Sequence, residues 1–380
     1  MMSWRKIRGT ARWLPSYAWQ RLMRSRAAKG PLHLIIALAD HFEPAIIPED
    51  PKTYASPEEQ ERRLEKWCRE YPLLVDRWRD SDGRPFCHTY FYPAEQYDKG
   101  LLDRLAEHCR AGWGEVEIHL HHGIHAPDTA ANTRRLLAEF RDTLGEHGCL
   151  SRLDGVGPLR YAFVHGNFAL ANSGICCCGV DDEMQILSET GCFADFTLPS
   201  APNPSQVGKI NSLYECALPL NQRAPHRRGY DLRRGCPPKT FPLIIQGPLL
   251  LSFSGQNGRR LLPVIENSAV TTRNPATMKR LELWRRAAVT VQRRPDWIFI
   301  KLHCHGMDPW DEEGMLGAPM RDFLEKLWQE TRSGGLYQTH FVTAREMVNI
   351  ALAACDGREG NPGEYRDYRF KLIRERDVRN

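Results

Sequence analysis

The amino-acid sequence predicts an α/β barrel built on a mostly parallel sheet, and three observations support this. First, apolar strand-like segments alternate with helical patterns from residue 31 onward, which is typical of parallel strands joined by right-handed helical crossovers. Second, residues 115–125 (EVEIHLHHGIH) alternate apolar side chains with Glu and His side chains. Third, the same alternation returns at residues 297–306 (WIFIKLHCHG). An apolar row under surrounding helices and a polar row toward the lumen are what a barrel strand requires.

The first half of the chain is regular. The segment 32–39 is almost entirely apolar, as in a buried parallel strand, and it ends in Asp-His-Phe-Glu-Pro at 40–44. The expected strands are 32–39, 86–92, 115–122 and 159–164, and the expected helices are 56–80, 99–109 and 128–146. Polar residues at the carboxyl ends of such strands are placed where barrel enzymes carry their chemistry.

The second half is interrupted once. Residues 205–270 are rich in Pro, Gly and Arg, and we interpret them as a β-rich insertion over the mouth of the barrel. The further expected strands are 194–197, 297–305 and 337–342, and the further expected helices are 275–292, 320–333 and 344–354. We therefore divide the chain into a basic N-terminal arm (1–29), a barrel (30–355) and a charged tail (356–380) without predicted structure.

Composition is that of an ordinary soluble enzyme. Of the 380 residues, 26% are charged and 42% hydrophobic, and no apolar run approaches the roughly 20 residues of a membrane span. The basic start lacks the apolar core of a signal peptide. The twelve cysteines contain no paired CxxC knuckle, so we expect reduced thiols and a cytoplasmic location.

The N-terminal arm is the most basic part of the chain. Residues 1–29 hold eight Arg and Lys residues and no acidic residue. Trp4, Ile7, Ala11, Leu14, Ala18 and Leu22 recur at helical spacing. Such a helix can lie on an anionic membrane surface at the inner face of the cell membrane, or it can pack on its own barrel. No recognition motif accompanies the charge, so we do not expect nucleic acid as a partner.

The histidines of residues 119–125 predict a metal site. Neutral imidazole is the commonest protein ligand for zinc-like ions, and four histidines follow one another within seven residues. His121 and His125 can reach one ion if the chain turns at Gly123. The alternative is a hydrogen-bonded histidine cluster without metal. We expect a divalent ion, with zinc as the first choice.

In its motif order the chain resembles the polysaccharide deacetylases of carbohydrate esterase family four. The resemblance rests on Asp40-His41, the strand Thr89-Tyr90-Phe91-Tyr92, the segment Glu117 to His125 and the late strand Leu302-His303-Cys304-His305. It covers roughly residues 31–345 apart from the insertion. It implies a distorted (β/α)7 barrel that removes N-acetyl groups from amino sugars.

The resemblance also implies roles for individual residues. Asp40 matches the general base of the family, and His41 stands at the place of its metal-binding aspartate. His121 and His125 match the two histidine ligands. His303 or His305 matches the general acid, and we favour His305 because it lies nearer the strand end, with His303 orienting it.

The chain departs from the family pattern at two places. His41 replaces an acid, which gives a three-histidine site or makes Asp40 a ligand, with Glu43 then left as the base. His165-Gly166-Asn167 stands where the family carries its Arg-x-Pro-Tyr segment. We take Asn167, His165 and Asp195 as candidate substrate residues.

Two functions follow from these patterns. The first is a metal-dependent hydrolase that removes an N-acyl group from an amino sugar in a glycan or in a nucleotide-linked or lipid-linked precursor. The second is an inactive barrel of the same type that binds glycans or acts as a scaffold in surface-polysaccharide biosynthesis. A barrel that only binds has no need of a stoichiometric metal ion, so metal content discriminates between them.

Overall fold

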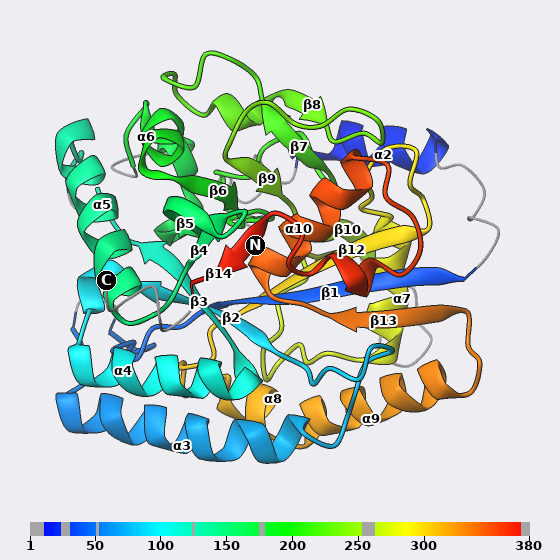
Figure 1. Ribbon diagram of the computed structural model, residues 1–380, viewed down its shortest axis with the longest axis horizontal. Coiled ribbons are helices and arrows are strands. Elements are labelled where there is room, and N and C mark those ends of the chain that lie inside the picture. Colours follow the sequence, from blue (N-terminus) through cyan, green and yellow to red (C-terminus); the bar gives the residue numbers. More distant parts are fainter. Residues whose placement is uncertain are drawn as a thin grey trace.

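The computed structural model describes residues 11–23, 31–50, 53–123, 126–174, 179–252 and 263–373. Within these ranges the fold is mixed α/β, with one large and mostly parallel sheet (Figure 1). The strands of this sheet are β1 (Leu32–His41), β2 (His88–Pro93), β3 (Gly114–Leu120), β4 (Ser151–Leu153), β5 (Val156–His165), β6 (Cys192–Asp195), β7 (Leu213–Cys216), β8 (Gly229–Asp231), β9 (Leu243–Ile245), β12 (Trp297–Cys304), β13 (Tyr337–Phe341) and β14 (Phe370–Leu372). A separate hairpin joins β10 (Leu250–Ser252) and β11 (Val264–Glu266).

The strand order is β12-β1-β2-β3-β5-β6-β9-β7-β8, and every pair from β12 to β9 is parallel. β13 also pairs with β1 in parallel, whereas β7, β8, β4 and β14 are attached in antiparallel pairs. Because parallel neighbours point the same way, the carboxyl ends of β1, β3, β5 and β12 meet at one edge. The alternating β/α order predicted from the sequence is confirmed.

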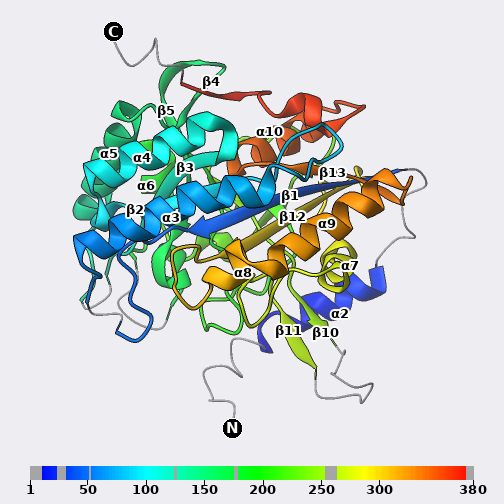
Figure 2. The same ribbon diagram turned by 90° about the horizontal axis from the view of Figure 1, so that it is seen from below.

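Helices cover both faces of this sheet. They are α2 (Leu14–Met23), α3 (Pro57–Val75), α4 (Lys99–His108), α5 (Ala130–Glu146), α6 (Glu183–Thr190), α7 (Met278–Ala287), α8 (Glu312–Leu316), α9 (Ala318–Arg332) and α10 (Ala344–Cys355). Viewed from below, α3, α8 and α9 lie side by side along one side of the molecule (Figure 2). Local sequence fixes the ends of several helices. The Ser56 hydroxyl accepts from the Glu59 N–H at the start of α3, and Thr343 with Glu346 forms a reciprocal cap on α10.

The two faces of the sheet carry different side chains, as the period-two pattern predicts. Ile298, Ile300 and Leu302 of β12 belong to the core beneath α3, α4 and α9, and we call this side the outer face. Val116, Ile118 and Leu120 of β3 lie on the same face. The opposite, inner face holds alanines and aromatic residues of the strands and is covered by α10 and α2. The outer rows predicted for β3 and β12 are confirmed.

The segment interpreted as an insertion is part of the sheet. β9 pairs in parallel with β6, and β7 and β8 extend the sheet beyond it. An apolar run of three residues, Leu243–Ile245, is fully buried there. Residues 205–252 therefore do not lie only over the mouth of the fold.

The tail is also integrated, contrary to the absence of structure expected for it. β14 pairs with β4, and the buried Arg366 forms ion pairs with Asp80, Asp82 and Glu346. These contacts tie residue 366 to segments almost 300 positions earlier, a relation that local sequence patterns cannot reveal.

The described part of the N-terminal arm packs on the rest of the molecule. Trp13 and Tyr17 are buried, and Gln20 donates to the Ile210 carbonyl. Of the stripe expected from helical spacing, Leu14 packs on the core, whereas Ala11, Ala18 and Leu22 are exposed. Trp4 and Ile7 lie outside the described residues. None of the helices in the described ranges combines the length and the apolar character needed to cross a bilayer.

Candidate metal centre

Five histidines and one glutamate come together at the carboxyl ends of β1, β3 and β12. The structure brings together four residues predicted from the sequence, His41, His121, His303 and His305, and adds His119 and Glu43. We call these six residues the histidine basin. The ligand atoms of His41, Glu43 and His119 all lie within 4.8 Å of one another, and all three residues are buried.

His119 is the best defined member of the basin. Its Nδ1 lies 2.8 Å from the Val164 carbonyl oxygen, so Nδ1 carries a proton and donates it. Its Nε2 faces Glu43 Oε1 at 3.3 Å. In a neutral imidazole this places a lone pair opposite a carboxylate oxygen, which is repulsive unless a proton or a metal ion lies between them. A backbone carbonyl that fixes the tautomer of a histidine is a common support for metal ligation.

The electrostatics around Glu43 favour its charged form. Burial raises the pKa of the Glu43 carboxyl, but the hydrogen bond to His119 and the charges of His121 and His305 outweigh it and lower the pKa to about 2. The surroundings of His41 instead favour its uncharged form. Burial, followed by the neighbouring rings of His305 and His119, holds the pKa of His41 well below its ordinary value, so His41 is a neutral imidazole.

The β12 histidines close the basin from the other side. The ring centroids of His305 and His41 lie 4.7 Å apart, and those of His303 and His41 lie 6.4 Å apart. His305 is half-buried, whereas His303 is buried, as its predicted deeper position requires. In the described part of the chain no hydrogen bond joins His303 to His305, and His303 Nδ1 has no partner, so the orienting bond predicted for His303 is not observed.

His121 lies at the rim of the basin. Its Nδ1 is 2.5 Å from Glu95 Oε1, and its Nε2 is 3.8 Å from Glu43 Oε1. Burial lowers the pKa of His121, but the hydrogen bond to Glu95 and the charges of Glu43 and Glu95 overcome it, and the net shift is upward. His125, predicted as the second ligand of this pair, lies outside the described residues, as do Cys176, Cys177 and Cys178.

Asp40 is not brought together with the histidine basin. Asp40 and His41 are successive residues of β1, so their side chains point to opposite faces. The Asp40 carboxylate is fully buried on the outer face, where Oδ2 accepts from His88 Nδ1 at 2.9 Å and Oδ1 accepts from the Gly306 N–H at 2.6 Å. The sequence interpretation placed Asp40 and His41 in one site because they are adjacent, and it did not apply the alternation of strand side chains to them.

A second cluster contains one of the predicted substrate residues. His165 lies with His122 and Glu183, and the ligand atoms of these three residues also fall within 4.8 Å of one another. Burial lowers the pKa of His165 to about 4. Asn167 is exposed in the turn that follows β5, with φ of 56°. The structure therefore separates His165 from the basin and leaves Asn167 at the surface.

Asp195, the third predicted substrate residue, is buried at the end of β6. Its carboxylate accepts from the Thr197 hydroxyl at 2.7 Å and from the Thr197 N–H at 3.1 Å. Burial raises the pKa of Asp195 to about 7, and burial lowers the pKa of Lys301 to about 7. Lys301 Nζ donates to the Leu198 carbonyl at 2.9 Å. Asp195 and Lys301 are therefore buried polar groups close to His303.

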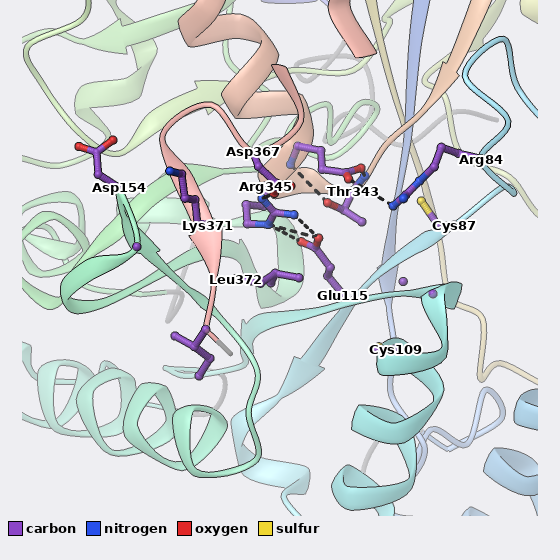
Figure 3. A pocket seen from close by; sticks show the side chains of 15 residues that line it. Arg84, Cys87, Cys109, Glu115, Asp154, Thr343, Arg345, Asp367, Lys371 and Leu372 are labelled. Atoms are coloured by element: carbon purple, nitrogen blue, oxygen red, sulfur yellow. Dashed lines mark hydrogen bonds and ion pairs between the residues drawn. The ribbon is translucent and has the colours of Figure 1, made fainter. Parts of the chain in front are cut away.

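A cavity of about 870 Å³ lies elsewhere, at the amino ends of β2 and β3. Figure 3 shows Arg345 and Glu115 facing each other inside it, at 2.7 Å between Nη2 and Oε1. Both side chains are buried, and Arg345 also donates to the Phe370 carbonyl. The pair lies at the amino ends of parallel strands, away from the carboxyl edge that holds the histidine basin, and we read it as structural.

Sequence reasoning missed Glu95 and undervalued Glu43, His119 and Glu183. Glu95 follows β2 directly at the carboxyl edge, and that position alone was a usable signal. Glu183 stands in an acidic run, Asp181 to Glu183, that resembles a solvated loop, yet it is fully buried. Nothing in its local sequence distinguishes it from Asp181, which is exposed.

Comparison with known proteins does not add a family. No protein-family model matches the chain, and no curated protein matches it.

Proposed function

We propose that this protein is a metal-dependent hydrolase that removes an N-acyl group, such as acetyl, from an amino sugar in a glycan or its precursor. The observation that carries the proposal is the convergence of His41, Glu43 and His119, with their ligand atoms within 4.8 Å of one another at the carboxyl edge of a parallel sheet. Two imidazoles and one carboxylate form a typical catalytic zinc set that leaves a position open. The choice of an amino sugar rests on the resemblance to the deacetylases.

The donor groups fit a divalent ion. His119 has its Nδ1 committed to the Val164 carbonyl, so Nε2 is the free donor. The carboxylate of Glu43 faces this nitrogen at 3.3 Å, an arrangement that a cation between the two groups would satisfy. His41 is neutral, as a ligand must be. In place of the predicted His41, His121 and His125, we propose His41, His119 and Glu43 as the protein ligands and zinc as the ion.

The distorted (β/α)7 barrel is part of this proposal. The paired order of the sheet ends at β12 on one side and passes through β6 and β9 on the other. Contacts support closure between these strands. Lys301 of β12 donates to the Leu198 carbonyl just beyond β6, and residues 268–270 pair with β12 through the His303 N–H and carbonyl.

The reaction requires an activated water and a protonated leaving amine. A bound zinc ion polarises the amide carbonyl and lowers the pKa of a water. His305, half-buried beside His41, is the group of this chain that we propose as the proton donor to the amine. His121 and Glu95 form a second proton-carrying pair at the rim, 3.8 Å from Glu43.

Asp40 takes a different role from the one implied by the resemblance. Its Oδ1 accepts from the Gly306 N–H, which is the residue directly after His305. A side chain at position 306 would collide with the Asp40 carboxylate and with Trp67, so glycine is required for this close approach. We propose that Asp40 is a positioning residue that fixes the turn carrying His305.

The test is hydrolysis itself. Acetate release is measured with an N-acetylglucosamine oligosaccharide, a nucleotide-linked N-acetylglucosamine and a lipid-linked one, before and after metal removal and zinc addition. We expect zinc-dependent acetate release from at least one substrate. His119→Gln should reduce turnover at least about 100-fold. The matched control is His147→Gln, which changes a histidine bonded to Asp103 at the end of α5, away from the basin.

Two results would count against the proposal. Hydrolysis that persists after complete metal removal would exclude the metal role of the basin. A protein that holds zinc in the basin and hydrolyses none of the three substrates would favour the glycan-binding or scaffold alternative.

A further inference from the structure

A second group of ligand-type side chains lies outside the histidine basin and has no role in the proposed hydrolysis. It consists of His122 just after β3, His165 at the end of β5 and Glu183 in the first turn of α6. All three are buried, and His165 and Glu183 have no exposed surface. Buried charged and imidazole groups are retained when they are paired or when they hold a metal.

The hydrogen bonds of the two histidines determine which ring nitrogens face inward. His122 Nδ1 lies 2.8 Å from Asp128 Oδ2, and His165 Nδ1 contacts the Gly166 carbonyl. Both Nδ1 atoms therefore carry a proton. A carboxylate and a backbone carbonyl are the usual partners that orient metal-ligating histidines through the far ring nitrogen.

Both Nε2 atoms then meet the same carboxylate oxygen. Glu183 Oε1 is 2.9 Å from His122 Nε2 and 3.4 Å from His165 Nε2. The His165 contact does not have hydrogen-bond geometry, and His165 Nε2 is a buried atom without a hydrogen-bond partner among the residues that the structure describes. A proton on His122 Nε2 satisfies only the contact between His122 and Glu183. The lone pair of His165 Nε2 then still faces the negatively charged Glu183 carboxylate.

Protonation of both rings is a poor alternative. The His122 and His165 ring centroids are 5.0 Å apart, and two adjacent imidazolium ions in a buried site repel each other. A single divalent cation satisfies both lone pairs and the carboxylate at once. Two imidazole nitrogens and one carboxylate oxygen suit zinc better than calcium or magnesium, which prefer oxygen ligands.

Neighbouring groups fix the positions of the His122, His165 and Glu183 side chains. Asp128 also accepts from the Thr133 hydroxyl at 3.0 Å, and Glu183 Oε2 accepts from the Ala171 N–H at 2.5 Å. Gly179, with φ of 70°, closes over the cluster, and a Cβ at that position would lie 2.8 Å from Glu183 Oε2 and 3.0 Å from His165 Nε2. Ordered supports on every ligand are the mark of a site rather than of a chance encounter.

We propose that His122, His165 and Glu183 form a second site for a divalent metal ion of the zinc type, on the outer face of the sheet. Its donor set is the same as that of the basin, but all three side chains are buried, and His165 and Glu183 have no exposed surface, so the role of this ion is structural. The ion ties α6 to β3 and β5, which pair with each other where Leu120 lies opposite His165. The site goes beyond the proposed hydrolase function, because it lies in a buried position beneath α5 and α6 and contacts no substrate.

The test counts metal ions in the full-length protein. Metal-free protein is titrated with zinc against a chromophoric chelator, and the thermal midpoint is recorded with and without zinc. We expect two tightly held equivalents in the wild type. Glu183→Gln and His165→Gln should each retain one equivalent, His119→Gln should retain one, and Glu183→Gln combined with His119→Gln should retain none.

The two sites are distinguished by which variant loses which ion. If the wild type holds one equivalent, and His119→Gln removes it, the structural site does not exist, although the basin remains a metal site. If Glu183→Gln reduces the count from one to none, only the structural site binds and the proposed function fails instead. Two equivalents that survive both Glu183→Gln and His165→Gln would place the second ion elsewhere and overturn the proposal. Where one of Glu183→Gln and His165→Gln does not fold, the other variant decides the matter.

The thermal readout adds a signature of the structural role. Zinc should raise the midpoint of the wild type and of His119→Gln by several degrees, because an ion that binds only the folded chain stabilises it. In Glu183→Gln the increase should be smaller than in the wild type, and in Glu183→Gln combined with His119→Gln it should disappear, because the basin ion also binds only the folded chain. An equal zinc-induced increase in Glu183→Gln and in the wild type would contradict a structural role.

Discussion

At the scale of single residues, the hydrogen bonds of ring nitrogens carry the functional argument. His119, His122 and His165 each commit Nδ1 to an oxygen acceptor, so each presents Nε2 toward a glutamate. Sequence patterns identify that histidines gather, but they do not reveal which nitrogen is free. The tautomer follows from the partner of Nδ1, which is Val164 of β5 for His119, Asp128 in the loop before α5 for His122, and the next residue, Gly166, for His165. The backbone path of the folded chain places each of these partners.

The first prediction concerns Asp40. Because its carboxylate bonds to His88 and to the Gly306 N–H on the outer face, Asp40→Asn should keep the zinc ion of the basin and lose less than about 10-fold in turnover. General-base catalysis typically contributes 100-fold or more. Steady-state kinetics over a range of pH provides the measurement, and a positioning role leaves the shape of the pH profile unchanged.

Asp40→Asn also tests whether Asp40 is the general base, as the resemblance implies, or a positioning residue, as we propose. A loss of 100-fold or more with full zinc occupancy would restore Asp40 as the general base, as the resemblance implies. The matched variant is Glu43→Gln, which should lower zinc affinity as well as turnover because Glu43 is a proposed ligand.

The second prediction concerns His108 and acid stability. Its Nε2 accepts from the Tyr90 hydroxyl at 2.9 Å, and burial, with the nearby His88, lowers the pKa of His108 to about 4. The unfolded chain therefore takes up a proton near pH 6.5, before the folded chain does. The neutral ring contributes stability in full above pH 6.5, and this contribution is lost as pH falls from 6.5 toward 4. At pH 5 the loss should be about 2 kcal/mol.

His108→Gln isolates this contribution from those of the other histidines. The difference in unfolding free energy between the wild type and His108→Gln, measured in urea, should be about 2 kcal/mol larger at pH 7 than at pH 5. A difference that is the same at both pH values would show that His108 has an ordinary pKa in the folded protein.

At the scale of elements, the parts that could be predicted from sequence are those specified by local pattern. The alternation in β3 and β12 predicted which side chains face the helices, because a strand has a period of two and the helices need an apolar surface. The strand β9 was missed as a member of the sheet because three apolar residues in a Pro-rich region carry little periodic signal. The pairing of β14 with β4 joins segments over 200 residues apart, and no local rule predicts it.

The third prediction concerns helix α2. Its Trp13 and Tyr17 side is packed, whereas Trp19, Leu22 and Met23 are 60%, 81% and 61% exposed. An exposed apolar row on a helix that carries Arg21 and no acidic residue favours attachment to an anionic membrane surface. Trp19→Glu combined with Leu22→Glu should lower binding to phosphatidylserine-containing vesicles at low salt at least about 10-fold.

The matched control for α2 is Leu73→Glu, which changes an equally exposed leucine on α3. It should leave vesicle sedimentation unchanged. If the α2 variant and the α3 variant both bind vesicles as the wild type does, α2 does not attach the protein to membranes, and the prediction of a membrane partner is wrong.

At the scale of the whole molecule, one pair of neighbouring strands organises both proposed ion sites. His119 of β3 pairs with Val164 of β5, and Leu120 pairs with His165. The basin lies on the inner face and the cluster of His122, His165 and Glu183 lies on the outer face. A parallel sheet whose strands end together thus positions a reactive group on one side and a structural tie on the other, with the carboxyl edge between them.

The central claim is that a metal ion lies among His41, Glu43 and His119, and zinc-edge anomalous diffraction from crystals of the full chain tests it most directly. The account predicts an anomalous peak at about 2.0–2.2 Å from His119 Nε2, from a His41 ring nitrogen and from a Glu43 oxygen, which are usual zinc–ligand distances. Crystals grown with excess zinc that show no anomalous density between these three side chains would contradict it.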